Sequence, residues 1–181
     1  MRSLVVLAVM SWSGSSSAEA PLDAKQVPFG GNRPQVQLDL GLAVVGAGFE
    51  HPLGEHVAIQ IGAQLFSTYF APWFDAGDQV VGFGGELRPT LFLSPHHRGV
   101  YFTPFLRVAR VTGEHETGAT GSGVGFSTGV FAGYAFALTK RLDLRVGAGV
   151  QYLRYLVDTS AGEVGVSTPF VALDLVVGYR L

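Results

Sequence analysis

The chain has no cysteine, few charged residues and no long hydrophobic run. Without cysteine it can form neither a disulfide nor a thiolate metal site. Its 12 lysine and arginine residues are outnumbered by 14 aspartate and glutamate residues, so the formal net charge of −2 argues against nucleic acid as a partner. No stretch reaches the roughly 18 consecutive apolar residues that a transmembrane helix needs. Disulfide-stapled, nucleic-acid-binding and helical membrane proteins are thus disfavoured, although 48% of the residues are hydrophobic.

The N-terminus has the three parts of a secretory signal peptide. Arg2 precedes the apolar stretch LVVLAVM, a small polar segment follows, and AEA occupies residues 18–20. This order of a charged region, a short apolar region and an A-x-A motif is typical of export signals. We predict a signal peptide over residues 1–20 with cleavage near Ala20, and one mature domain over residues 21–181, since this length suits a single domain.

The mature chain is dominated by period-two alternation. In VQLDLGLAV, residues 36–44, every even position is a bulky aliphatic, and Gln37, Asp39, Gly41 and Ala43 lie between. Such alternation indicates a strand with two different faces, and no helical period competes with it. Most of the strands are longer than the usual five or six residues of globular sheets, whereas a tilted membrane strand needs about 9–11. Strands are predicted at residues 35–51, 55–70, 79–94, 99–113, 122–139, 141–158 and 167–181.

One face of these strands is bulky and almost free of charge, and the other carries glycine, alanine, glutamine and a few charged residues. A water-facing exterior would be rich in charged residues, whereas the interior of a small barrel needs small side chains and can hold paired charges. We therefore expect the bulky face to meet lipid and the small, polar face to fill the lumen. Aromatic residues fall toward the two ends of the bulky face: Tyr69, Phe83, Phe126 and Tyr152 at the outer end, and Phe102, Tyr134, Phe136 and Tyr179 at the other.

The charged residues of the small face predict an ionic network inside the barrel. Buried charges require partners, and an eight-stranded barrel is just wide enough for its side chains to fill it. A leaky or gated pore is the alternative for these charges, and a soluble ligand-binding barrel with reversed faces is the alternative for the whole chain. The predicted network consists of Asp39, Glu86, Arg88, Arg107, Asp143, Arg145 and Asp174.

The C-terminal segment LDLVVGYRL alternates up to the last residue, with Leu173, Leu175, Val177, Tyr179 and Leu181 on one face. It resembles the C-terminal signal that the barrel-assembly machinery reads, although that signal usually ends in phenylalanine. The whole mature chain resembles small outer-membrane β-barrels of the OmpA-like or OmpX-like kind. This resemblance implies a Gram-negative outer membrane, contacts with its lipid and lipopolysaccharide, and an up-and-down antiparallel barrel with transmembrane strands and periplasmic turns at HPLGE, SPHHRG and TKR.

Seven strands are one short of an even number, which bacterial single-chain barrels have. The topology of the family then requires an additional ascending strand before residue 35. We place this first strand at residues 22–30, with GGNRP as the first outer loop. An eight-stranded antiparallel barrel is thus the predicted fold.

The predicted function is structural or interactive: envelope integrity or presentation of short acidic loops. A lipid A-modifying enzyme is the alternative from another class, because some small outer-membrane barrels use serine, histidine and an acid near the outer leaflet. Glu114, His115 and Ser122 are its candidate residues here, and a nucleophile needs a base within hydrogen-bond reach. The other motifs of those enzymes are not recognisable. We therefore predict no enzymatic activity, cofactor or metal, and the oligomeric state stays open.

Overall fold

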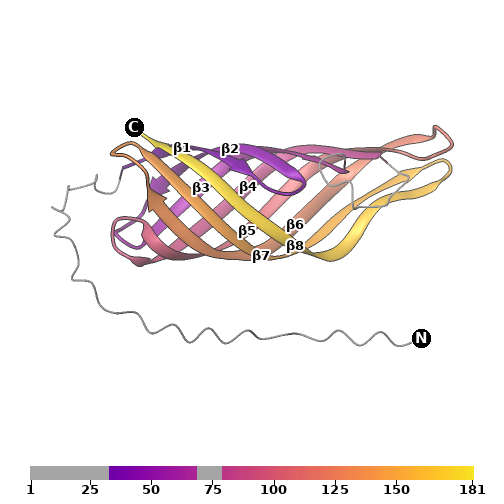
Figure 1. Ribbon diagram of the computed structural model, residues 1–181. Coiled ribbons are helices and arrows are strands. Elements are labelled where there is room, and N and C mark those ends of the chain that lie inside the picture. Colours follow the sequence, from indigo (N-terminus) through magenta and orange to yellow (C-terminus); the bar gives the residue numbers. More distant parts are fainter. Residues whose placement is uncertain (1–32, 69–78) are drawn as a thin grey trace, which may run out of the picture.

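Eight antiparallel strands form a closed ring in the computed structural model, which describes residues 33–68 and 79–181 (Figure 1). Each strand pairs with its neighbours in sequence, and the ring closes between the first and the last strand. The predicted eight-stranded up-and-down barrel is confirmed. The strands are β1 (Gln35–Leu40), β2 (Val44–Pro52), β3 (Val57–Ser67), β4 (Gln79–Ser94), β5 (Arg98–Glu114), β6 (Thr120–Ala137), β7 (Leu142–Thr159) and β8 (Gly162–Arg180).

The single strand predicted over residues 35–51 is wrong, because the chain reverses between β1 and β2. The backbone N–H of Gly41 donates to the carbonyl of Val44 at 2.8 Å and closes the turn. Odd-numbered residues face inward in β1, and after the reversal even-numbered residues face inward in β2. Val44, predicted on the lipid face, is therefore only 3% exposed, and Val45 faces outward. The aliphatic series continues through the turn at Leu42, so the period-two pattern did not reveal the reversal.

The prediction that residues 22–30 form the first strand is also wrong. β1 pairs with β8 from Gln35 opposite Arg180 to Leu40 opposite Leu175, and this pairing completes the ring. Residues 22–30 and the predicted signal peptide lie outside the described residues. Splitting the segment 35–51 into two strands therefore supplies the eighth strand that the even number requires.

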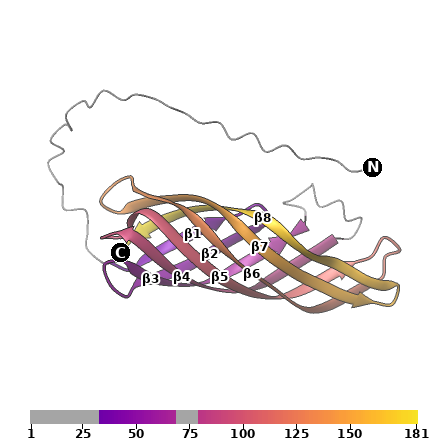
Figure 2. The same ribbon diagram turned by 90° about the horizontal axis from the view of Figure 1, so that it is seen from below.

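The strands differ greatly in length, from 6 residues in β1 to 19 in β8. As a result, β5–β8 extend at one end well past β1 and β2, which Figures 1 and 2 show from two sides. We call this the extended end. The predicted strands 141–158 and 167–181 left residues 159–166 outside any strand, which is wrong, because β7 continues to Thr159 and pairs with β8 across a two-residue turn, with Asp158 opposite Glu163. No helix within the described residues is long and apolar enough to span a membrane.

The pleat separates the residues into an outward and an inward set. Along β5, outward Phe102 and Leu106 are 42% and 47% exposed, whereas inward Tyr101 and Phe105 are almost fully buried. The outward set is bulky and apolar along most of each strand. The bulky face thus lies on the outside of the barrel and the smaller, more polar face on the inside.

The interior is not polar throughout, contrary to the expectation of a lumen filled by polar residues. Toward the extended end it is filled by a buried apolar cluster: Ala43, Val44, Phe66, Val80, Ala109, Val111, Leu153, Tyr155, Val157 and Val164. Valine is found at inward positions of β4, β5, β7 and β8 there, whereas the inward positions of β6 stay glycine. Side chains thus fill this end of the lumen as an apolar core.

Gly84 and Gly85 provide a matched test of the ring's packing. A Cβ at Gly84 would lie 1.9 Å from the carbonyl oxygen of Val108 on β5, whereas a Cβ at Gly85 would be 3.7 Å from its nearest neighbour, the carbonyl of Gly62. We expect Gly84→Ala to lower the free energy of unfolding by about 1–3 kcal/mol and Gly85→Ala to change it by less than about 0.5 kcal/mol. Urea unfolding in detergent micelles, followed by circular dichroism, measures both. Equal stabilities of the two variants would contradict this packing.

Candidate functional site

A group of five charged residues lies in the middle of the lumen: Asp39, Glu86, Arg88, Arg107 and Asp174. We call it the central ion cluster. These residues come from β1, β4, β5 and β8, and none is more than 6% exposed. The pleat turns each of them inward, and closure of the ring brings β1 and β8 opposite β4 and β5. The cluster thus joins strands across the barrel.

The two guanidinium groups of the cluster bridge its three carboxylates. Arg88 donates to Oδ2 of Asp39 at 2.8 Å and also to Asp174. Arg107 donates to Oδ2 of Asp39 at 3.3 Å and to Glu86. Charge-assisted hydrogen bonds from one guanidinium to two carboxylates fix both position and orientation, and they compensate the loss of water around each charge. The cluster therefore acts as a cross-brace of the lumen.

Two further ion pairs lie toward the end with the short turns. Arg145 donates to both carboxylate oxygens of Glu50 at 2.6 Å, across the lumen from β7 to β2. Arg180 donates to the two oxygens of Asp143 at 2.7 and 2.8 Å. Gln35 donates to Glu50 at 2.6 Å. These bidentate pairs brace the second half of the lumen.

All seven residues of the predicted lumen network are thus buried and paired, but the network is larger than the sequence indicated. Glu50, Arg180 and Tyr101 were missed, and the hydroxyl of Tyr101 donates to Asp174. Arg180 and Asp174 are both even-numbered residues of β8 and therefore lie on the same face, so the alternation alone could have identified Arg180 as inward. Glu50 could be assigned to the inside only after the turn at Gly41 had been recognised.

Aromatic rings cover the buried guanidinium groups. The Cζ atom of Arg107 lies 4.4 Å from the ring centroid of Phe105, and that of Arg88 lies 5.2 Å from the ring of Phe131. The two rings stack on each other with centroids 4.8 Å apart. Arg145 lies over Phe92 in the same way, at 4.9 Å. Cation–π contacts in a desolvated interior add to the ionic bracing.

A small void lies beside the central ion cluster. A void of about 160 Å³ between Asp39, Gln60, Gln64 and Glu86 has no room for the centre of a water molecule. In this part of the described chain the lumen is therefore filled by its own side chains, as the diameter of an eight-stranded barrel allows.

The candidate catalytic residues do not form a nucleophile–base pair in the described structure. Nδ1 of His115 lies 2.9 Å from the hydroxyl of Thr117 and accepts the backbone N–H of the same residue at 3.2 Å. Ser122 lies in β6 opposite Thr112, and Glu114 lies in β5 opposite Thr120. Both of these side chains are exposed on the outward face. The hydrogen bonds of His115, by contrast, stay within its own turn.

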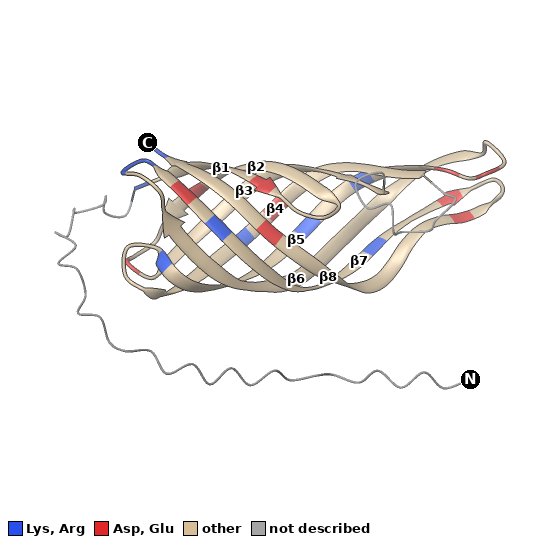
Figure 3. Ribbon diagram, viewed as in Figure 1, with Lys and Arg blue, Asp and Glu red and all other residues tan. Residues whose placement is uncertain are grey.

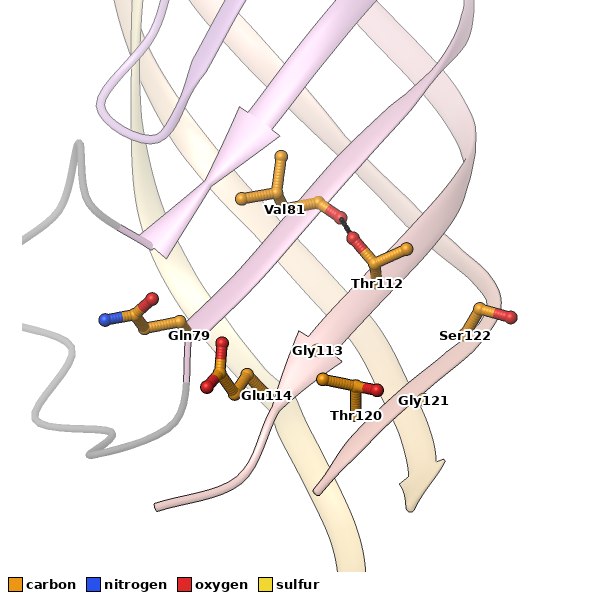
Figure 4. A pocket seen from close by; sticks show the side chains of 8 residues that line it. All are labelled: Gln79, Val81, Thr112, Gly113, Glu114, Thr120, Gly121 and Ser122. Atoms are coloured by element: carbon orange, nitrogen blue, oxygen red, sulfur yellow. Dashed lines mark hydrogen bonds between the residues drawn. The ribbon is translucent and has the colours of Figure 1, made fainter. Parts of the chain in front are cut away.

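Glu114 and Ser122 do line a shared pocket of about 480 Å³ on the outward face at the extended end (Figure 4). The pocket spans the ends of β4, β5 and β6. Its polar groups are an amide, a carboxylate and three hydroxyls, and the hydroxyl of Thr112 donates to the carbonyl of Val81 at 3.5 Å. Such a lining suits a hydroxyl-rich polar group. The residues are Gln79, Val81, Thr112, Gly113, Glu114, Thr120, Gly121 and Ser122.

The proposed assembly signal lies on the outward face of β8 and just after it. Leu173, Leu175 and Tyr179 are exposed, Val177 is half-buried, and Leu181 is the terminal residue. A receptor could therefore read these side chains from outside the sheet, and their role stays a prediction.

The described residues contain no group of three or more histidine, aspartate or glutamate side chains that could hold a metal ion. His97, in the turn between β4 and β5, instead connects two turns. Its Nε2 lies 2.9 Å from the carbonyl of Gly54, and its ring stacks on Phe92 at 4.8 Å. Burial lowers the pKa of His97. The neutral imidazole with its proton on Nε2 thus donates to Gly54.

No family model and no curated protein sequence matches the chain. Two solved structures align with it over most of their lengths. The N-terminal β-barrel domain of Pseudomonas aeruginosa OprF is 16% identical, with 83% of this chain and 98% of that chain covered and a TM-score of 0.47. Neisserial surface protein A (NspA) is 13% identical, with 82% and 95% covered and a TM-score of 0.49. Both likenesses are too distant to transfer an activity to this chain.

Removal of Arg88 tests the central ion cluster. Arg88→Gln leaves Asp39 and Asp174 without their main partner in a buried site, so we expect the free energy of unfolding to fall by about 3–5 kcal/mol. Arg110→Gln, which removes an exposed arginine of β5, is the matched control and should cost less than about 0.5 kcal/mol. Urea unfolding in micelles compares the two. A similar loss in both variants would show that the cluster does not brace the barrel.

Proposed function

We propose that the chain is an integral outer-membrane β-barrel with a structural, non-conducting role in the cell envelope. The observation that carries this proposal is the inverted distribution of side chains. Five carboxylates and four arginines are buried among the described residues, while large apolar residues such as Ile61, Val124 and Val171 are more than 60% exposed. A protein that kept this outward surface in water would expose far more contiguous apolar area than soluble monomers do.

The height of the apolar surface supports insertion in a bilayer. On β5 the outward residues from Val100 to Val108 carry no charge, and Arg110 is the next one. The ten residue steps from Val100 to Arg110, at about 3.3 Å each and tilted by roughly 40°, span about 25 Å, which is the height of the apolar band of membrane barrels. Outward aromatic residues lie toward both limits of the band, including Tyr134 and Phe136 at one limit and Phe126 and Tyr152 at the other.

The two ends of the barrel support one orientation. Membrane barrels have short periplasmic turns and longer structures outside the cell. Here the turns after β2, β4 and β6 are short and share an end with the C-terminus, whereas the other end is extended (Figure 1). Acidic residues gather at the tips of the extended hairpins (Figure 3). We therefore assign the extended end to the cell surface.

A structural role is favoured over a pore by what fills the lumen. The central ion cluster, the ion pairs and the aromatic rings occupy the inner part, and the apolar cluster occupies the extended end. Opening a path for ions would require breaking several buried charge contacts at once, each of which is costly. The barrel is thus proposed to contribute rigidity and membrane anchorage.

Outer-membrane fractionation combined with heat modifiability tests the proposal. We expect the protein in the detergent-extracted outer-membrane fraction, with an unboiled band that migrates faster on SDS gels than the boiled one, because the closed barrel resists SDS. The purified protein should give no steady conductance in planar bilayers. A protein recovered entirely without detergent would contradict membrane insertion, and a discrete conductance altered by Glu86→Gln would favour the pore.

A further inference from the structure

Two arginines face outward at the upper limit of the apolar band. Arg110 on β5 and Arg154 on β7 are both exposed, and each is followed four residues later by an acidic residue, Glu114 and Asp158. Both strands run toward the extended end, so the order is the same on each: apolar surface, arginine, one further outward position (Thr112 or Leu156), then acid. The repeated order places the two basic residues between the lipid-facing band and the acidic tips.

The two arginines flank β6. Arg110 lies opposite Val124, and Arg154 lies opposite Phe126, two residues further along the same strand. Two strand spacings and a two-residue offset place their Cα atoms about 12 Å apart. Both side chains thus border one patch of the outward surface, and both are long enough to reach toward the same ligand.

Neither guanidinium has a partner among the described residues. Within the described residues, neither Arg110 nor Arg154 forms an ion pair or a side-chain hydrogen bond, whereas all four buried arginines are paired. Glu114 and Asp158 are about 13 Å further along their strands, which is too far for a salt bridge. Within the described part of the chain, these two always charged donors are therefore available to an anionic ligand on the same part of the outward surface.

The chemistry of the two arginines and their neighbours indicates phosphate as the ligand. An arginine costs little near the membrane interface, where its head reaches the polar region, and guanidinium binds phosphate in a bidentate manner. Phe83 lies opposite Arg110 on β4, and Phe126 lies opposite Arg154, so each arginine has an interfacial aromatic beside it. These are the neighbours expected where lipid headgroups begin.

The lining of the pocket at the ends of β4, β5 and β6 indicates which class of lipid binds there. It begins at Thr112, the outward residue that follows Arg110 on β5, and its lining adds the hydroxyls of Thr120 and Ser122, the amide of Gln79 and the carboxylate of Glu114 (Figure 4). Hydroxyls, an amide and a carboxylate together donate to and accept from sugar hydroxyls. A glycerophospholipid headgroup would leave most of these groups without a ligand.

We infer that the outward surface of β5–β7 binds the phosphorylated sugar headgroup of an outer-leaflet glycolipid. Arg110 and Arg154 bind its two phosphates on either side of β6, and the adjoining pocket holds sugar hydroxyls beside the phosphate at Arg110. This site rests on the proposed outer-membrane location and extended-end orientation. It makes the barrel a specific partner of the surface leaflet, beyond a general fit to lipid.

Native mass spectrometry of the refolded protein in micelles, titrated with diphosphoryl lipid A, tests the site. We expect Arg110→Gln and Arg154→Gln each to weaken binding about tenfold, and the double variant about a hundredfold, because each removes a charged hydrogen-bond donor and the positions are well separated. Arg141→Gln is the matched control, an exposed arginine at the opposite end, and should bind like the wild type. Equal binding by the double variant and the control would overturn the proposal.

Titrations with two more lipids test the two phosphate contacts and the sugar pocket separately. With monophosphoryl lipid A, only one of the two single variants should weaken binding further, and equal further losses would overturn the two-phosphate arrangement. With phosphatidylglycerol, the double substitution Thr112→Val and Ser122→Ala should have no effect, whereas it should weaken diphosphoryl lipid A several-fold. Equal affinity for both lipids with the same arginine dependence would overturn the assignment to a glycolipid.

The folded state is checked on the same samples by heat modifiability. If the wild type inserts into membranes and shows the fast unboiled band but binds lipid A no better than the double variant does, the glycolipid site fails and the proposed function stands. If the wild type is recovered without detergent, the proposed function fails. The two failures are therefore distinguishable.

Discussion

The pairing of buried charges across a closed lumen is the interaction on which the rest of the structure depends. Asp39 on β1 reaches Arg88 on β4 and Arg107 on β5, and Glu50 on β2 reaches Arg145 on β7. These contacts exist only when β1 meets β8, because an open sheet would expose the same charges to water. Ring closure and charge pairing thus require each other.

The same constraint explains why arginine has two roles in the chain. Inside, each guanidinium meets carboxylates and three of them lie over aromatic rings, as Arg107 does over Phe105. Outside, Arg110 and Arg154 have no ionic partner among the described residues and lie where the apolar surface ends. One residue type therefore braces the lumen and, in our proposal, contacts the leaflet, and the pleat alone decides which role a position has.

The sequence predicted the fold class and most inward positions because period two is read directly from residue order. It failed where another constraint took over. At Gly41 the aliphatic series ran through a turn, which placed Val44 on the wrong face and hid Glu50. Between residues 159 and 166 no strand was predicted, yet the strands continue there as a long hairpin. The pairing of specific charges depends on barrel closure and cannot be read from spacing.

Accessibility of side chains along β5 tests most directly that the bulky face meets lipid. The chain lacks cysteine, so single cysteines at Phe102, Leu106 and Val108, and at Phe105 and Ala109 as inward controls, can each carry a spin label in refolded vesicles. We predict strong relaxation by oxygen and none by a water-soluble nickel complex at the three outward positions, and weak effects of both at the inward ones. Strong relaxation by the nickel complex at the outward positions would contradict a membrane-embedded exterior.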